Sequence, residues 1–297
     1  MLRVRYYKLE DSLIKTNIKV VNMSDIHSNV QYLNDALEYA LKIDADIITI
    51  PGDLFDSVDN AHNAEIVEIL KRVENTQIYI SNGNHDLVRI QGRGPFAKLT
   101  YEPDKKYYES LNSAKNIHVF LNNSDKYFYK SVEIVALDPG QDWYDKTCEN
   151  EEVFKSILDE YLSGLDKENT FRLMLLHSCN GLIRKNKLES ELAGINLVLS
   201  GHNHACLTPE FIQSVSKTHR GLFGPYNKFF MQGSYGTWTN GNTSVILSNG
   251  LTKMGESHGS KIVRNLVNNV YKSDIDVIEL THGESHSLKL SRKYVQK

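Results

Sequence analysis

The chain has 297 residues, of which 40% are hydrophobic and 24% are charged. This composition is that of an ordinary folded protein and excludes disordered, collagen-like and coiled-coil chains. The formal net charge of -3 at pH 7 also excludes a global positive field that would attract nucleic acid or anionic lipid. We expect a single domain over 1–297, with loop elaborations near 87–115 and 205–260.

The N-terminal sequence and the cysteines indicate a cellular compartment. The first residues, MLRVRYYKLEDSLIKT, contain no long apolar run, and no stretch approaches the roughly 18 apolar residues of a membrane-spanning helix. Cys148, Cys179 and Cys206 are odd in number and far apart, so they predict neither a disulfide framework nor a thiolate zinc site. We therefore expect a cytoplasmic protein that does not span a membrane.

Apolar runs and helical patterns alternate along much of the chain. In chain order we expect a strand at 18–24, a helix at 30–43, a strand with its exit loop at 45–53, a helix at 64–73, and strands at 77–81, 173–178 and 195–201. Such alternation is typical of parallel βαβ units. Antiparallel hairpins are indicated at 125–137, at the Asn249-Gly250 pair after 243–248, and at 273–281. The mixture predicts an α/β fold, a four-layer α/β/β/α sandwich of two mixed sheets flanked by helices.

Polar clusters follow the predicted strands at the points where loops begin. They are Asp25-Ile26-His27, Gly52-Asp53, Gly83-Asn84-His85-Asp86, His177, and Gly201-His202-Asn203-His204. Because ligands gather at the carboxyl ends of strands in open α/β sheets, these clusters are expected to converge. On extended segments, residues two apart project from one face, as we expect for Asp25 with His27 and for His202 with His204.

Each cluster has a simpler structural alternative. The alternative for Asp25 or Ser28 is that it caps the helix that begins near Val30, and the alternative for Asp53 is that it is only a turn residue. A single buried histidine such as His177 is more often satisfied by hydrogen bonds than by a metal. Taken together, however, five strand ends supply oxygen and imidazole donors and no thiolate, which favours a metal centre.

The ordered pattern D-x-H, G-D, G-N-H-D, H and G-H-x-H resembles the calcineurin-like metallophosphoesterase superfamily, and it extends over residues 25 to 204. This resemblance implies two divalent ions bridged by Asp53. It implies Asp25, His27, Asp53 and His204 around one ion, and Asp53, Asn84, His177 and His202 around the other. Mixed imidazole, carboxylate and amide donors suit manganese, iron, cobalt or zinc better than calcium or copper.

The resemblance also implies a reaction, which is hydrolysis of a phosphoric ester, with a diester expected. A hydroxide that bridges the ions would attack phosphorus in line, and His85 would protonate the leaving oxygen. Asp86 is expected to fix the tautomer of His85 and to raise its pKa. The alternative for His85 is a residue that only orients the metal ligands. Many members have glycine where Ser28 and Ala205 stand here, and Ser28 is expected either to touch substrate or to cap the helix.

Two segments are candidates for substrate contact, and surface exposure or a lid is the alternative for each. They are 87–108, with Arg89, Arg93, Lys98, Lys105 and Lys106, and 217–230, with Lys217, Arg220, Phe223, Tyr226, Lys228, Phe229 and Phe230. A small phosphate ester or nucleotide is the expected partner, and nucleic acid is a weaker alternative. Rival functions are an Mre11-like nuclease, a pyrophosphatase of the UDP-diacylglucosamine type, and a non-catalytic metal-binding scaffold. The pyrophosphatase alternative is suggested by a faint resemblance at 235–238, at 247–253 and in the last strand, DVIEL.

Overall fold

The computed structural model describes residues 2–91, 98–101, 105–140, 143, 151–165, 169–184, 187–224, 229–256 and 260–296. A seven-stranded sheet has the spatial order β17 (Ser287–Gln296), β1 (Leu2–Asp11), β16 (Ser273–His282), β2 (Ile18–Asn22), β3 (Ile47–Pro51), β4 (Gln77–Ser81) and β7 (Ile117–Val119). A six-stranded sheet has the order β14 (Gly236–Asn240), β15 (Thr243–Leu247), β13 (Leu197–Ser200), β10 (Phe171–Leu175), β9 (Val132–Ala136) and β8 (Lys126–Tyr129). Two small sheets pair β5 (Val88–Gln91) with β6 (Lys98–Tyr101), and β11 (Ile183–Arg184) with β12 (Lys187–Leu188).

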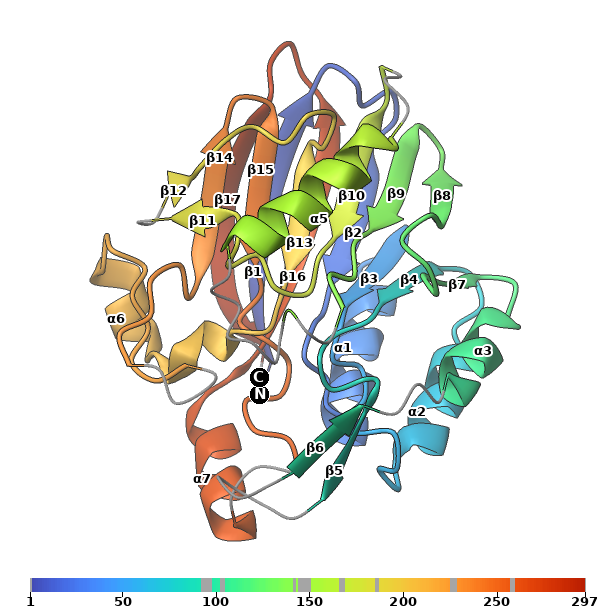
Figure 1. The fold of residues 1–297 in the computed structure, drawn as a ribbon, viewed down its shortest axis with the longest axis vertical. Coiled ribbons are helices and arrows are strands. Elements are labelled where there is room, and N and C mark those ends of the chain that lie inside the picture. Colours follow the sequence, from blue (N-terminus) through green and yellow to red (C-terminus); the bar gives the residue numbers. More distant parts are fainter. Residues whose placement is uncertain are drawn as a thin grey trace.

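Helices cover the outer faces of both large sheets (Figure 1). The described helices are α1 (Val30–Lys42), α2 (Asn63–Lys71), α3 (Lys106–Asn112), α5 (Glu151–Ser163), the 3₁₀ helix η2 (His204–Leu207), α6 (Glu210–Val215) and α7 (Lys261–Val270). One apolar cluster joins α1, α2 and α3 to the seven-stranded sheet, and another joins α5 to the six-stranded sheet. A third cluster lies between the two sheets. These three cores separate four layers, so the predicted α/β/β/α sandwich is confirmed.

The strand β3 shows why the central strands are apolar along their whole length. Side chains alternate between the two faces of a strand. Ile47 packs between the sheets, whereas Ile48 and Ile50 pack against the helices. Since both faces are covered, a strand in this position has no solvent side and the sequence shows a continuous apolar run.

The predicted hairpins are correct only in part. β8 and β9 pair antiparallel, as expected for 125–137. The prediction for 273–281 is wrong, because β16 pairs parallel with β1 and antiparallel with β2, both distant in sequence. The prediction at Asn249-Gly250 is also wrong: after β15 the chain crosses to the other sheet, where Leu251 N donates to Ser24 O at 2.8 Å.

Helix α1 begins at a residue other than the two proposed caps. The side chain of Asn29 caps α1 by accepting a hydrogen bond from Tyr32 N at 3.1 Å. Ser28 is buried and its Oγ donates to Asn63 Oδ1 at 2.7 Å. The expectation that Asp25 or Ser28 caps this helix is therefore wrong, because the cap is Asn29, the residue after Ser28.

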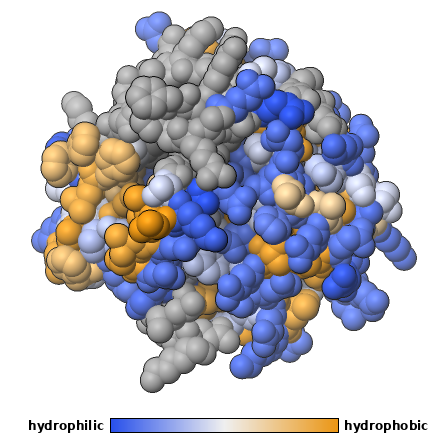
Figure 2. All heavy atoms as spheres, turned by 90° about the horizontal axis from the view of Figure 1, so that it is seen from below, coloured by the Kyte–Doolittle hydropathy of each residue, from blue (hydrophilic) through white to orange (hydrophobic). Residues whose placement is uncertain are grey.

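In Figure 1, α6 lies at the left edge beside the lower ends of the strands and α7 lies at the bottom, and neither helix has a buried residue. On α7, Ile262 is 81% exposed and Leu266 is 63% exposed. Figure 2 shows apolar side chains gathered on the side of the lower face where these helices lie. No helix within the described residues combines the length and the apolar character that a membrane crossing requires.

We predict that Leu199→Ala lowers the free energy of unfolding by about 2 to 5 kcal/mol, because it leaves a cavity between the sheets. Leu199 is fully buried in the inter-sheet core. The matched control Leu41→Ala alters a side chain that is 43% exposed and is expected to change stability by less than about 1 kcal/mol. Urea unfolding measures both values, and equal losses would contradict the inter-sheet core described here.

Candidate metal centre

Five loops meet where the carboxyl ends of five strands come together. β2, β3 and β4 run parallel in one sheet, and β10 and β13 run parallel in the other. The loops after these strands carry, in chain order, Asp25 and His27, Asp53, Asn84 and His85, His177, and His202 and His204. Backbone hydrogen bonds join neighbouring loops, for example Ile26 N to Asp53 O at 2.8 Å and Gly201 N to His177 O at 2.9 Å.

One group of donors consists of Asp25, His27 and His204. His204 Nε2 lies 3.5 Å from Asp25 Oδ1 and 3.4 Å from His27 Nε2. His27 Nε2 in turn lies 3.7 Å from Asp53 Oδ2. The nitrogen and oxygen atoms of this group therefore point toward a common position at which an ion can be held.

A second group consists of Asp53, His177 and His202, with Asn84 beside them. His177 Nε2 lies 3.1 Å from Asp53 Oδ2. Asn84 Oδ1 lies 3.2 Å from His177 Nε2 and 2.9 Å from His202 Nδ1. The structure thus brings together all seven side chains that the sequence singled out as metal ligands, and Asp53 belongs to the surroundings of both groups.

Close approach of the loops requires small residues at two points. A Cβ on Gly52 would lie 2.5 Å from His177 Nδ1, and one on Gly201 would lie 2.4 Å from Asp25 Oδ2. Gly52 also has a φ of +91°, which L side chains rarely adopt. The glycines beside the donors are therefore needed to bring these loops within contact distance.

The backbone carrying the donors differs from the extended segments that were expected. Asp25, His27, Asp53, His202 and His204 all have positive φ, between 47° and 72°. The prediction that pairs two residues apart share one face of an extended segment is therefore wrong. Left-handed backbone is costly for residues other than glycine, and it occurs preferentially where surrounding structure imposes a functional geometry.

Burial and neighbouring charges set the pKa values of the donor side chains in the absence of metal. Burial alone lowers the pKa of His27, but Asp56 and Asp53 outweigh burial and raise this pKa to about 9. His177 behaves in the same way: burial opposes the charge, and Asp53 raises its pKa to about 9. Burial and the neighbouring His177 lower the pKa of His202 to about 3. Burial opposes ionisation of Asp53, but His177 and His85 outweigh it and lower the pKa of this carboxyl.

Two oxygen atoms orient the histidines from behind. Pro51 O lies 2.8 Å from His177 Nδ1, so the opposite nitrogen faces Asp53. Asp56 Oδ1 lies 3.3 Å from His27 Nδ1 and forms an ion pair with this ring when it is protonated. Such partners fix the tautomer of a metal-ligating histidine and increase its basicity. Sequence reasoning missed Asp56, although it follows Asp53 by only three residues in the same loop.

His85 lies at the edge of the donor groups. Its ring contacts that of His27 at a centroid distance of 4.8 Å, and its side chain is 13% exposed. His85 Nδ1 is 3.0 Å from Asp56 O, and its backbone N donates to Asp53 Oδ1 at 2.9 Å. Asp56, whose carboxylate lies 3.9 Å from the same ring nitrogen, therefore occupies the place beside His85 that was expected for Asp86.

Asp86 is buried behind the loops that carry the donors. Its Oδ2 accepts from Asp53 N at 2.8 Å and from Gly83 N at 2.6 Å, and its Oδ1 accepts from Phe55 N at 2.8 Å. Burial and the nearby Asp53 raise the pKa of Asp86 to about 7. Asp86 therefore holds the backbone of two site loops in register.

The two departures from the family pattern are buried. Ser28 Oγ accepts from Asp56 N at 3.0 Å as well as donating to Asn63, so it fixes the loop that carries Asp56. Neither role expected for Ser28, substrate contact or helix capping, corresponds to these contacts. Ala205 is 3% exposed and has a positive φ of 51°, a conformation in which glycine would be less strained.

The two segments proposed for substrate contact are described only in part. Arg93, Tyr226 and Lys228 lie outside the described residues, and the side chain of Lys98 is not described. Arg89 pairs with Asp59 at 2.8 Å, and Lys105 Nζ donates to Leu121 O at 3.2 Å. The exposed rings of Phe223 and Phe229 pack against each other, with a distance of 5.2 Å between their centroids. Lys106, Lys217, Arg220 and Phe230 also have described positions, and none belongs to the donor groups.

Comparison with known proteins identifies the family. The model of calcineurin-like phosphoesterases matches residues 18–206, which include every donor above. No curated protein matches the chain in sequence. Among solved structures, a novel archaeal phosphodiesterase is 12% identical, with 79% of this chain and 85% of that chain covered and a TM-score of 0.38.

Two further structures give similar values. The phosphopantetheinyl hydrolase PptH of Mycobacterium tuberculosis is 12% identical, with 64% of this chain and 84% of that chain covered and a TM-score of 0.38. The protein TT1561 of Thermus thermophilus is 13% identical, with 63% of this chain and 83% of that chain covered and a TM-score of 0.41. Because these TM-scores are below 0.5, the assignment depends on the family match, which extends over more than half of the chain. The chain belongs to the calcineurin-like phosphoesterase family and is a metal-dependent phosphoric ester hydrolase.

Proposed function

We propose that this chain hydrolyses phosphodiesters with two divalent ions held around a shared Asp53 carboxylate. The observation that carries the proposal is the position of Asp53, whose Oδ2 lies 3.7 Å from His27 Nε2 of one group and 3.1 Å from His177 Nε2 of the other. One group offers Asp25, His27 and His204, and the other offers Asn84, His177 and His202. A shared carboxylate is the arrangement expected where two ions lie close together.

The donor set fits first-row divalent ions. It combines imidazole nitrogens with carboxylate and amide oxygens, which suits manganese, iron, cobalt or zinc. All the donors except His204 and Asn84 are buried, so they are shielded from bulk water. When bound, such ions supply Lewis-acid polarisation of the phosphoryl oxygens and lower the pKa of coordinated water.

The protein itself contributes geometry and a proton. Asp53 N and Phe55 N are fixed by Asp86, and Asp53 Oδ1 accepts from His85 N, so the loops that present the donors support each other. His85 Nδ1 faces Asp56 O, which leaves Nε2 as the nitrogen that would exchange a proton with the leaving oxygen. An alkoxide leaving group needs this proton, and a diester with an alkyl leaving group is the substrate class in which it matters most.

The proposal predicts that the purified protein hydrolyses a chromogenic phosphodiester faster than the matching monoester. A chelator should abolish this turnover, and added manganese should restore it, because the donors alone supply no Lewis acid. Initial rates with both esters measure the effect. Turnover that survives complete removal of metal would contradict the proposal, and no turnover of either ester with any of the four metals would favour the scaffold alternative.

A second prediction concerns the shared carboxylate. Asp53→Asn should lower the bound metal from two ions to one or none per chain and reduce turnover by about a hundredfold or more, because the bridging charge is lost. Metal analysis of the dialysed protein and initial rates measure the two effects. Asp44→Asn is the matched control, since Asp44 is exposed and has a φ of 53° against 52° for Asp53. Retention of both ions by Asp53→Asn would rule out the bridging assignment.

A third prediction separates proton donation from ligand orientation at His85. His85→Ala should keep its metal but lose about 10²- to 10⁴-fold in turnover of diesters with alkyl leaving groups, and much less with a nitrophenyl leaving group. A plot of rate against leaving-group pKa should therefore become steeper. His62→Ala, at an exposed histidine before α2, is the control. An equal loss for all leaving groups, together with loss of metal, would indicate that His85 only orients ligands.

A further inference from the structure

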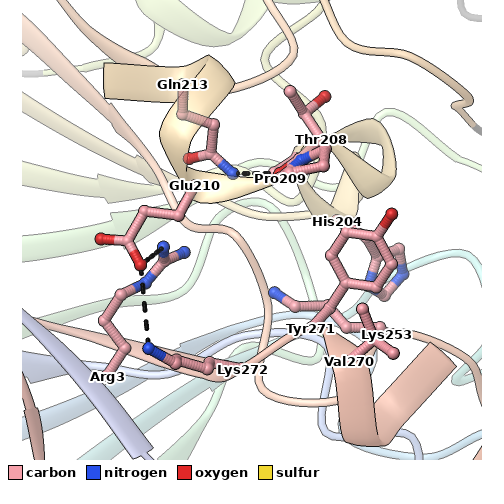
Figure 3. Close-up of a pocket in the computed structure, with 11 residues that line it drawn as sticks. Arg3, His204, Thr208, Pro209, Glu210, Gln213, Lys253, Val270, Tyr271 and Lys272 are labelled. Carbon is pink, nitrogen blue, oxygen red and sulfur yellow. Dashed lines mark hydrogen bonds and ion pairs between the residues drawn. The ribbon is translucent and has the colours of Figure 1, made fainter. Parts of the chain in front are cut away.

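A cavity of about 180 Å³ borders the metal centre, and the donor His204 forms one of its walls (Figure 3). Its walls come from β1, from the segment that enters α6, from Lys253 and from the last residue of α7 with the two residues after it. Among the described residues that line it, only His204 and Ala205 fall within the 18–206 match to the family. The rest of the pocket is therefore built by parts of the chain that the family pattern does not include.

The side chains that line the cavity carry more positive than negative charge. Arg3, Lys253 and Lys272 contribute three cations and Glu210 contributes one carboxylate, while the buried carboxylate of Asp274 behind the wall pairs with Arg3 and lies 3.7 Å from Lys253. Glu210 Oε2 lies 3.2 Å from Arg3 Nη1 and 4.0 Å from Lys272 Nζ, so this carboxylate bridges two cations (Figure 3). The position between Arg3 and Lys272 is thus already occupied by an anionic group of the protein, the Glu210 carboxylate.

The bridging carboxylate is partly exposed, while one of its partners is fixed. Glu210 is 39% exposed and Lys272 is 36% exposed, and ion pairs of such exposure contribute little to stability. The Arg3 side chain is only 5% exposed, because its Nε and Nη2 atoms donate to Asp274 on the paired strand β16. Arg3 Nη1 is therefore held facing the pocket, where it can pair with Glu210 or with another anion.

Lys253 adds positive charge on the inner wall. Its Nζ donates to Asn249 O and to Gly250 O, the latter at 3.0 Å, and lies 3.7 Å from Asp274 Oδ2. These carbonyls belong to the segment that passes Asp25, where Thr252 N donates to Asp25 O at 2.9 Å. One end of the pocket is thus tied to the metal centre, and the other end carries the Arg3–Glu210–Lys272 bridge.

We propose that this pocket binds a second anionic group of the substrate, a phosphate or a carboxylate, which displaces Glu210 from Arg3 and Lys272. This inference rests on the proposed function, because it places the scissile phosphate at the metal centre beside His204. The substrate class is then a phosphodiester with another anionic group a few bonds away. A cavity of this size is smaller than the roughly 300 to 1,000 Å³ of sites that enclose a whole ligand, so it fits one part of a substrate.

The test is calorimetric titration of the metal-loaded protein with three non-hydrolysable phosphonates of equal length. One carries a second phosphonate, one a carboxylate, and one an uncharged methyl group at the far end. At least one doubly anionic compound should bind about tenfold or more tightly than the methyl compound, because it gains charge-assisted hydrogen bonds. Comparing the phosphonate and carboxylate tails then distinguishes the two anions.

Two substitutions with opposite expected effects assign the difference to this pocket. Lys272→Glu should reduce the affinity ratio to about one, whereas Glu210→Gln should increase it severalfold by removing the competing carboxylate. Lys261→Glu, an exposed charge reversal on α7 away from the pocket, should leave the ratio unchanged. A ratio near one in the unaltered protein, or one that survives Lys272→Glu, would overturn the proposal.

The same titrations distinguish failure of this inference from failure of the proposed function. If the methyl compound does not bind and no ester is hydrolysed, the metal site does not act as proposed. A doubly anionic compound that still binds, and loses affinity in Lys272→Glu, would nevertheless support the pocket. Binding of none of the three compounds would overturn both.

Discussion

The buried carboxylate of Asp53 is the constraint on which the rest of the site depends. It is 1% exposed and faces histidines from two different loops, while its backbone oxygen accepts from Ile26 N and His27 N. A carboxylate so placed is costly unless positive charge or hydrogen bonds compensate it. Without metal, protonated His27 and His177 supply that charge, as their pKa values of about 9 indicate. A divalent ion held by these nitrogens would replace the protons, so metal binding would be coupled to proton release at neutral pH.

The fold meets this constraint by supporting strained loops from outside. Left-handed backbone at five donors would relax if the loops were independent. It persists because the loops are joined by backbone hydrogen bonds and by Asp86, which accepts from three backbone amides. The elevated pKa of Asp86, about 7, results from its burial together with the same crowding of acids near Asp53. The scaffold behind the donors thus determines their geometry as much as the donors themselves.

The sequence predicted the parts of the site that depend on strand order. The clusters follow apolar runs, and parallel strands of one sheet place their ends at one edge, so convergence of Asp25, Asp53 and Asn84 was predictable. Pairing between distant segments was not predictable from the sequence. The alternating pattern in 273–281 predicts a strand, but it does not indicate that the strand pairs with β1 and β2. The role of Asp56 was missed for the same reason: its partner His27 lies on another loop.

Pairing between segments near the two ends of the chain places the pocket next to the metal donors, although the two are built mostly from different parts of the sequence. The parallel register of β1 with β16 sets Arg3 opposite Asp274, and that contact directs the guanidinium into the pocket beside His204. Residues 18–206 carry the donors, whereas β1 and the residues after 206 carry the remaining pocket walls. A substitution at the partly exposed Glu210 or Lys272 changes the charge in the pocket at a distance from the metal donors. The strand β1 therefore contributes Arg3 to the pocket wall, and its pairing with β16 within the seven-stranded sheet holds Arg3 in place beside His204.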